Sequence, residues 1–359
     1  MNHVRPAGLA NGKVTRDQHL RDSLREQIMG FRTTQMIHVA AKLKLADHLA
    51  AGPRSPAELA ATVGAEPQAL HRLLRALASL GIFSEDAGGA FALTPEAELL
   101  RSDVQGSLRS VALLYGEDWL WQAYGGLLHS VRTGDPAFVK AHGQPLYGYL
   151  HEHPRAAVQF NAAMSACSVQ EALAILEAYD FSAARSVVDI GGGHGALLAA
   201  LLRGHPALTG TLFDLPSVVA GAVHLLNEAG IADRARRIAG DFFDEAPAGG
   251  DLYLMKSVLH NWDDVDARRI LSTCRAAMKP EARLLVIERV VPEGNEPAEA
   301  KLFDINMLVV AGGRERTAAE YGALFEQSGL QLERVTATRS PLSVIVAGAF
   351  SAEVDTGSA

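Results

Sequence analysis

The chain has only two cysteines in 359 residues, Cys167 and Cys274, and they lie far apart in the sequence. This excludes a disulfide framework, disfavours a cysteine metal site and indicates two buried thiols in a reducing compartment. No apolar run approaches the ~18 residues that a membrane helix needs. The first residues carry charges without an apolar segment behind them, unlike a signal peptide. We therefore expect a soluble, cytoplasmic protein without a membrane partner.

Basic residues are also in short supply, with 33 Lys and Arg against 41 Asp and Glu, for a formal net charge of −8. This balance disfavours nucleic acid as a partner, because phosphates must be neutralised by clustered cations. Apolar residues make up 48% of the chain, which is enough to fill the core of one large or two ordinary domains.

The first part of the chain, residues 17–105, follows a helical pattern that ends in a short hairpin. The segment 55–58 (SPAE) predicts a helix start, with Ser as the N-cap, Pro in the first turn and an acid three residues on. A second helix is expected over 66–80, and apolar segments on both sides of Ala87-Gly88-Gly89 predict a β-hairpin. Helix, turn, helix and hairpin together form a winged-helix pattern.

A winged helix usually indicates DNA binding, but this one lacks the positive charge that binding DNA requires. Between residues 55 and 100 the only full cations are Arg72 and Arg75, against six acidic residues. A surface that binds phosphates cannot be built from that balance. We therefore interpret residues 17–105 as a structural or dimerising domain.

The rest of the chain divides into a helical segment and a segment of alternating strands and helices. Residues 106–178 are interpreted as a helical linker that contributes to an acceptor pocket, and residues 179–351 as a doubly wound, Rossmann-like α/β domain. Strands are expected at 186–190, 209–214, 236–239, 251–257, 282–289, 331–337 and 342–349, and helices at 195–203, 217–229, 264–278 and 317–328. The last two strands must pair antiparallel, because too few residues separate them for a crossover.

A nucleotide site is predicted where the first of these strands ends. The segment 186–195 (SVVDIGGGHG) indicates a buried strand and a glycine-cornered turn, followed by a helix whose N-terminus faces a ligand. Gly191, Gly193 and Ala196 fit the dinucleotide fingerprint G-x-G-x-x-A, a weak signal alone. Asp214 ends the next strand, where it can bind ribose hydroxyls or, alternatively, cap the helix near Pro216. NAD and S-adenosylmethionine (SAM) both carry a ribose, so both stay open.

Three further features add chemistry at the same edge of the sheet. Asp189 precedes the glycines, where it can hold the turn or face a cationic ligand. The segment 240–243 (GDFF) places an acid beside aromatics that could bracket an adenine ring. The segment 254–264 (LMKSVLHNWDD) delivers His260 to the rim of the glycine turn, and a histidine there is a candidate general base.

With these residues the chain resembles the class I SAM-dependent O-methyltransferases of the small-molecule type. These include the plant caffeate and flavonoid enzymes, the animal acetylserotonin enzyme and bacterial antibiotic-tailoring relatives. The resemblance covers residues from about 21 to 350 and implies that the winged-helix domain forms an interlocked homodimer. It is carried by FNAAMS (160–165), VDIGGGHG (188–195), FDLP (213–216), GDFF (240–243), LMKSVLHNWDD (254–264), IERVVP (287–292) and GGRERT (312–317).

The resemblance implies roles for individual side chains. His260 is the expected base, and Glu288 and Glu315 are the expected carboxylates that orient it. Together with the strand ends, it leads us to expect cofactor contacts from Asp189, Gly191, Gly192, Gly193, Asp214, Leu215, Gly240, Asp241, Phe242, Lys256 and Ser168. The acceptor pocket is expected to contain Phe160, Met164, Trp119, Asn261, Asn306 and Met307. Asn261 departs from the plant enzymes, which commonly have Asp there.

The predicted function is therefore SAM-dependent O-methylation of a hydroxyl, of the phenolic kind, on an aromatic secondary metabolite. S-adenosylhomocysteine would be the second product, and no metal is expected. A base near the hydroxyl helps because a phenol of pKa ~10 is a poor nucleophile at neutral pH. Three alternatives stay open: a SAM-binding enzyme with non-methylating chemistry, such as hydroxylation or a pericyclic step, a winged-helix regulator that senses a ligand, and a NAD dehydrogenase.

Overall fold

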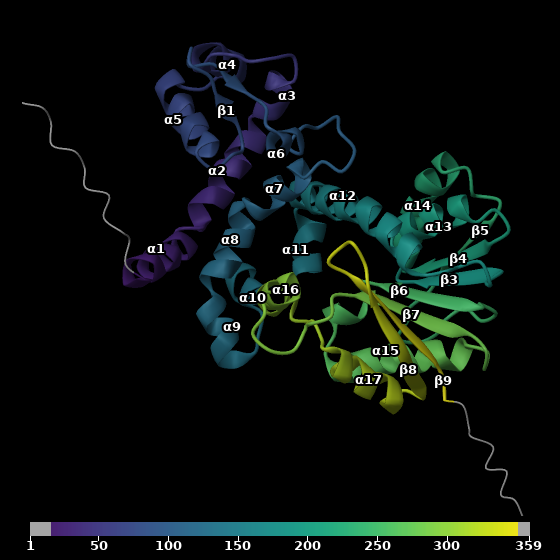
Figure 1. Ribbon diagram of the computed structural model, residues 1–359. Coiled ribbons are helices and arrows are strands. Elements are labelled where there is room, and N and C mark those ends of the chain that lie inside the picture. Colours follow the sequence, from purple (N-terminus) through teal and green to yellow (C-terminus); the bar gives the residue numbers. More distant parts are fainter. Residues whose placement is uncertain (1–15, 351–359) are drawn as a thin grey trace, which may run out of the picture. The chain divides into compact units, whose positions relative to one another are not determined.

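The structure, a computed structural model, describes residues 16–350 (Figure 1). The chain divides between Gly116 and Glu117 into two compact units. The domain boundaries expected from the sequence, after residues 105 and 178, stay predictions. No helix within residues 16–350 combines the length and the apolarity that crossing a bilayer requires.

The first unit consists of helices and one two-stranded hairpin, as the winged-helix pattern predicts. Its elements are α1 (Arg16–Ile28), α2 (Phe31–Lys42), α3 (Leu45–Leu49), α4 (Pro56–Val63), α5 (Pro67–Ala78), β1 (Ser84–Glu85), β2 (Phe91–Ala92), α6 (Pro95–Glu98) and α7 (Arg109–Tyr115). The predicted helix start is confirmed as a capping box, in which Ser55 Oγ accepts from Glu58 N–H and Glu58 Oε2 accepts from Ser55 N–H. Strands β1 and β2 pair antiparallel, and their Phe91 is buried against α5 residues such as Leu74.

The second unit opens with the helices α8 (Asp118–Gly125), α9 (Leu127–Thr133), α10 (Ala137–His142), α11 (Leu146–Glu152) and α12 (Pro154–Ala178). Its sheet contains β3 (Ser186–Ile190), β4 (Thr209–Asp214), β5 (Ala235–Ala239), β6 (Leu252–Lys256), β7 (Arg283–Glu288), β8 (Leu330–Ala337) and β9 (Ser343–Ala349). The strand order is β5-β4-β3-β6-β7-β9-β8. Every strand lies within one residue of its predicted ends, and β8 and β9 pair antiparallel as expected.

Helices cover both faces of this sheet (Figure 1). Ile175 of α12, Leu198 of α13 (Ala196–Gly204) and Leu226 of α14 (Pro216–Glu228) belong to the buried cluster on one face. Ile270 of α15 (Asp264–Ala277) and Phe325 of α17 (Ala318–Gln327) belong to the cluster on the other. The doubly wound class is confirmed. The parallel strands β3 and β6 lie side by side although they are not consecutive in the chain, which makes their carboxyl ends a topological switch point.

One helical segment was not predicted. Helix α16 (Glu299–Asn306) continues directly into η2 (Met307–Ala311), a π-helical turn that ends at Gly312. The apolar spacing of this segment is irregular, because the π turn inserts an extra residue into the helical period. It leads into the GGRERT motif, so it carries one wall of the candidate site.

Candidate active site

The turn after β3 has a backbone geometry that glycine adopts most readily. Gly191, Gly193 and Gly195 have φ angles of 64°, 61° and 84°. At Gly192, a Cβ atom would lie 2.5 Å from Oδ2 of Asp189. The turn therefore brings bare backbone to the carboxyl end of β3, where a ligand can approach closely.

Asp189 is buried against this turn, with 1% of its surface exposed. Among the described residues its Oδ2 has no hydrogen-bond partner. Burial raises the pKa of Asp189 to about 7, the positive charge of Lys256 opposes the rise and Asp214 adds to it. A buried carboxyl oxygen without a partner, next to glycine backbone, offers an acceptor that a ligand donor or cation can satisfy.

Asp214 holds the glycine turn through its side chain. Its Oδ2 accepts from Gly193 N–H at 2.8 Å, and its Oδ1 accepts from Leu215 N–H at 2.7 Å. The alternative role as the N-cap of α14 is not the one found, because Leu215 is the N-cap and has no side-chain cap bond. Leu215 itself is half-exposed at this rim.

The end of β5 lies beside the same turn. Asp241 Oδ1 accepts from Phe243 N–H at 2.9 Å, which fixes the chain after Gly240. The Phe242 ring lies 3.5 Å from the position that a Cβ on Gly191 would occupy, and its centroid is 6.1 Å from that of Trp262. An aromatic wall therefore stands next to the glycine backbone.

Lys256 at the end of β6 is paired with an acid that the sequence did not single out. Its Nζ lies 2.6 Å from Glu171 Oε2 and 3.5 Å from Ser168 Oγ, and both charged side chains are largely buried. Ser168 and Glu171 are three residues apart on α12, so they share a helix face. The sequence contains only the three-residue spacing of Ser168 and Glu171. That spacing identifies Glu171 as the partner of Lys256 only once α12 is known to pass the end of β6.

The structure brings His260, Glu288 and Glu315 together from three separate segments. His260 lies in a short 3₁₀ turn, η1 (Leu259–Asn261), entered through Ser257 at a φ of 54°. Its Nδ1 is 2.9 Å from Glu315 Oε1 and 3.5 Å from Glu288 Oε2. Glu288 Oε1 also accepts from Val258 and Leu259 N–H, both at 2.9 Å. Glu288 therefore binds the turn through Oε1, and its Oε2 faces the ring at ion-pair distance.

The protonation chemistry of this trio follows from its burial and charge. Burial disfavours the charged imidazole, but Glu288 and Glu315 outweigh it, so the pKa of His260 is raised. Burial raises the pKa of Glu288, His260 opposes the rise and Glu315 adds to it. A carboxylate oxygen only accepts hydrogen bonds, so the contact with Glu315 Oε1 favours the tautomer with the proton on Nδ1 and leaves Nε2 as the acceptor nitrogen.

Three of the expected acceptor residues, Asn261, Asn306 and Met307, differ in their contacts and burial. Asn261 Nδ2 donates to the carbonyl oxygens of Ser257 and Val258 at 3.0 and 3.3 Å, so its amide braces η1. Asn306 Oδ1 accepts from Tyr124 OH at 2.9 Å. Met307, which follows it, is buried.

Three other expected acceptor residues show contacts away from His260. Trp119 is buried in an aromatic cluster, with its ring centroid 6.0 Å from that of Phe138. The Phe160 ring is 6.5 Å from that of Tyr147, and Met164 is 40% exposed on the same helix α12. Their roles at the acceptor stay predictions.

The ring of Phe303, on α16, stacks nearly parallel to the ring of His260. Its ring is inclined by 13° to that of His260, with centroids 6.4 Å apart. The guanidinium carbon of Arg289 lies 3.7 Å from the Phe303 centroid, and its Nε bonds Glu299. An Arg-backed aromatic wall therefore flanks the imidazole.

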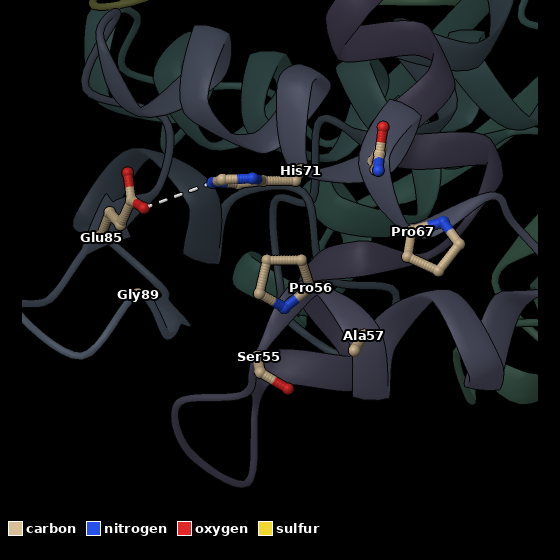
Figure 2. Close-up of a pocket in the computed structure, with 8 residues that line it drawn as sticks. Ser55, Pro56, Ala57, Pro67, His71, Glu85 and Gly89 are labelled. Carbon is tan, nitrogen blue, oxygen red and sulfur yellow. Dashed lines mark ion pairs between the residues drawn. The ribbon is translucent and has the colours of Figure 1, made fainter.

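A separate hollow lies in the first unit and contains none of the expected site residues. It has a volume of about 360 Å³ and lies where α4 and α5 begin, with the ion pair of His71 and Glu85 on one side (Figure 2). Both helix starts are already capped by Ser55 and Glu66, so we assign no function to it.

Comparison with known proteins identifies two family domains in the chain. Residues 124–331 match an O-methyltransferase domain and residues 26–103 an O-methyltransferase dimerisation domain. The chain is 46% identical to the phenazine O-methyltransferase PhzM of Lysobacter antibioticus over 324 residues, which cover 90% of this chain and 95% of that protein.

Two further relatives extend the likeness to antibiotic biosynthesis. The mitomycin biosynthesis 6-O-methyltransferase of Streptomyces lavendulae is 43% identical, over 87% of this chain and 90% of that protein. The solved structure of CalO1, a methyltransferase in calicheamicin biosynthesis with S-adenosylhomocysteine (SAH) bound, is 38% identical with a TM-score of 0.85, over 94% of this chain and all of that one. The chain belongs to the SAM-dependent O-methyltransferases with an N-terminal dimerisation domain.

Proposed function

We propose that the chain methylates a hydroxyl of a planar aromatic acceptor, with Nε2 of His260 as the general base. The observation that carries this proposal is the 2.9 Å contact between His260 Nδ1 and Glu315 Oε1. It fixes the tautomer in which Nε2 can take a proton. SAM supplies a methyl group on a sulfonium, and the acceptor oxygen bonds to that methyl as the sulfur–carbon bond breaks.

The residues at the glycine turn fit such a donor. The left-handed turn leaves backbone bare, and Oδ2 of Asp189 is a buried acceptor without a partner. Asp214 would bind ribose hydroxyls with the lone pairs that Gly193 and Leu215 leave unused. Asp241 and Phe242 would hold the adenine of SAM. Lys256 and Ser168 would hold the end of SAM that lies away from the adenine.

The protein's own contribution to the reaction is alignment and proton transfer. Holding oxygen, methyl and sulfur in line removes most of the entropic cost of a two-molecule step. The hydroxyl proton passes to Nε2, and the imidazolium that forms is stabilised by the two buried carboxylates. A base placed in this way contributes about 10²–10⁴-fold.

The acceptor is expected to be an aromatic hydroxyl compound of secondary metabolism, like those in the names of its relatives. The Phe303 wall parallel to His260 supports a flat ring, and the amides of Asn261 and Asn306 offer polar contacts. Relatives that carry N-methyltransferase names make the methylated atom a question for product analysis.

A homodimer is the proposed assembly. Leu20, Leu24 and Ile28 are each more than half exposed and lie four residues apart on α1, so they form one apolar stripe. A stripe of that kind needs a protein partner. The absence of a metal, the absence of nucleic-acid binding and a cytoplasmic location stay predictions.

The proposed activity is tested by SAH release. The chain is incubated with SAM and a set of aromatic hydroxyl and amino compounds that includes 3-amino-4-hydroxybenzoate, and SAH and methylated products are measured by mass spectrometry. We expect O-methylation, and we expect His260→Ala to bind SAM normally while losing most turnover. Product formation without SAH would favour the non-methylating alternative, and full turnover by His260→Ala would remove the base from the mechanism.

A further inference from the structure

The loop that carries Glu315 also carries a buried arginine that the mechanism above does not use. Arg316 is 0% exposed and is the largest fully buried side chain among the described residues. A buried guanidinium must place its charge and its five N–H donors within the protein. The groups that receive those donors therefore indicate what the side chain does.

The guanidinium joins the two ends of the turn that presents His260. Nη1 donates to the carbonyl oxygen of Leu259 at 3.1 Å, and Nη2 donates to that of Trp262 at 2.8 Å. These two residues bracket His260 and Asn261. Nε and Nη2 both donate to Oδ1 of Asp264, at 3.0 and 2.8 Å, which balances the buried charge.

The backbone of Arg316 is bonded to the segment that follows Glu288. Val290 and Arg316 form an isolated parallel bridge, and Val291 N–H donates to Arg316 C=O at 2.9 Å. Glu315 precedes Arg316 in the chain. One residue is therefore connected to all three segments that supply the His260, Glu288 and Glu315 side chains.

We propose that Arg316 is a positioning residue of the methyl-transfer site, whose guanidinium sets the angle and depth of the His260 turn against Glu315 and Glu288. The planar fork of donors is what the role requires, because it spans two carbonyls and one carboxylate together. A lysine ammonium keeps the charge but cannot span them. The expected effect of Arg316 on kcat rests on the proposed function, whereas its expected effect on the position of the His260 ring does not.

The test compares Arg316→Lys and Arg316→Met with Arg234→Met. Arg234 is a matched control, because its guanidinium also donates to backbone carbonyls, those of Leu202, His205 and Leu208, around β4 and away from the trio. Two quantities are measured in each protein. One is the pKa of His260 by NMR of histidine-labelled protein, assigned with His260→Gln, and the other is kcat and KM with SAM and an acceptor that is turned over.

We expect the pKa of His260 to fall in both Arg316 variants, because the contact with Glu315 loosens. Loss of a nearby positive charge alone would raise that pKa in Arg316→Met and leave it unchanged in Arg316→Lys, so the direction separates positioning from electrostatics. We expect kcat to fall about 10²-fold at unchanged KM for SAM, as a misplaced catalytic group gives. In Arg234→Met, we expect the pKa of His260 and kcat to equal those of the wild type.

An unmoved or raised pKa of His260 in Arg316→Lys, or a kcat equal to that of Arg234→Met, would overturn the proposal. If Arg316→Met does not fold, Asp264→Ala removes the carboxylate that accepts from the guanidinium instead, and we expect the pKa of His260 and kcat to fall in the same way but by less. If no acceptor is turned over, the proposed function fails, but the NMR result still decides the position of His260.

Discussion

Gly313 is packed directly against the carbonyl group of His260. A Cβ on Gly313 would overlap the His260 carbonyl oxygen and lie 2.8 Å from the Cα of Asn261. The next residue, Arg314, donates its N–H to the same carbonyl at 2.9 Å. The backbone of His260 and the loop that carries Glu315 are therefore in contact, and even one methyl group on Gly313 would separate them.

We predict that Gly313→Ala lowers kcat by about 10²-fold, because the His260 turn must move away from Glu315. SAM binding should be unchanged, since the glycine turn after β3 is not involved. Gly322→Ala in helix α17 is the matched control, because a Cβ there makes only an ordinary 3.7 Å contact with the side chain of Leu332. Steady-state kinetics and calorimetric titration with SAM measure the two effects, and equal kcat values for the two variants would contradict the prediction.

Asn261→Asp should weaken the enzyme although Asp is common at this position in the plant enzymes. The Asn261 amide donates to two backbone carbonyls of its own turn, and a carboxylate cannot donate. We expect kcat to fall roughly tenfold at pH 8, which corresponds to about 1–2 kcal/mol for the lost hydrogen bonds. The loss should shrink at lower pH, where the new carboxyl becomes protonated. A variant with the wild-type pH–rate profile would show that the amide bonds do not matter.

The pH dependence of kcat reports the charge around His260. Its pKa is raised in the folded protein, so the wild-type rate should rise with pH through an acid limb above the ordinary value for histidine. In Glu315→Gln the amide oxygen can still accept from Nδ1, but the negative charge is lost. The acid limb should move to lower pH while the plateau falls, because the base is weaker. A limb that moves to higher pH would mean that Glu315 does not stabilise the imidazolium.

Stability should depend on pH through Asp189. Its pKa of about 7 lies above the ordinary 3.8, so the folded state keeps a proton that the unfolded chain releases. This group therefore makes unfolding easier as pH rises from about 4 to about 7, by at most ~1.4 kcal/mol per pH unit. Urea unfolding of Asp189→Asn should show a stability gain over wild type that is larger at pH 8 than at pH 5. A gain independent of pH would mean that Asp189 is ionised throughout.

Much of the sheet could be predicted from local signals, whereas the role of His260 as the base stays a prediction. Most of the strands are short apolar runs bounded by turn residues, and parallel strands place their carboxyl ends at one edge, so His260 and the glycine turn were expected together. The partners of these groups are a different matter. Glu171 reaches Lys256, and Arg316 reaches Leu259 and Trp262, only through tertiary packing, and no spacing in the chain encodes such pairs.

The role of Asp214 shows a second reason for incomplete prediction. The sequence offered two partners for this carboxylate, a ribose and a helix start, and in the structure its oxygens hold the backbone of Gly193 and Leu215. Helix α16 escaped prediction because the π turn that follows it breaks the regular period. Local sequence patterns cannot predict which groups a side chain contacts when those groups come from another segment of the chain.

The adjacency of β3 and β6 has a consequence for changing what the enzyme accepts. The ladder between these strands fixes the spacing between the glycine turn and the segment that leads to His260, because the two segments follow paired strands. The segment 299–311, by contrast, supplies Phe303, Asn306 and Met307 from outside the sheet. Under the proposed function, directed evolution toward new acceptors can therefore start in that segment and leave the paired strands unchanged.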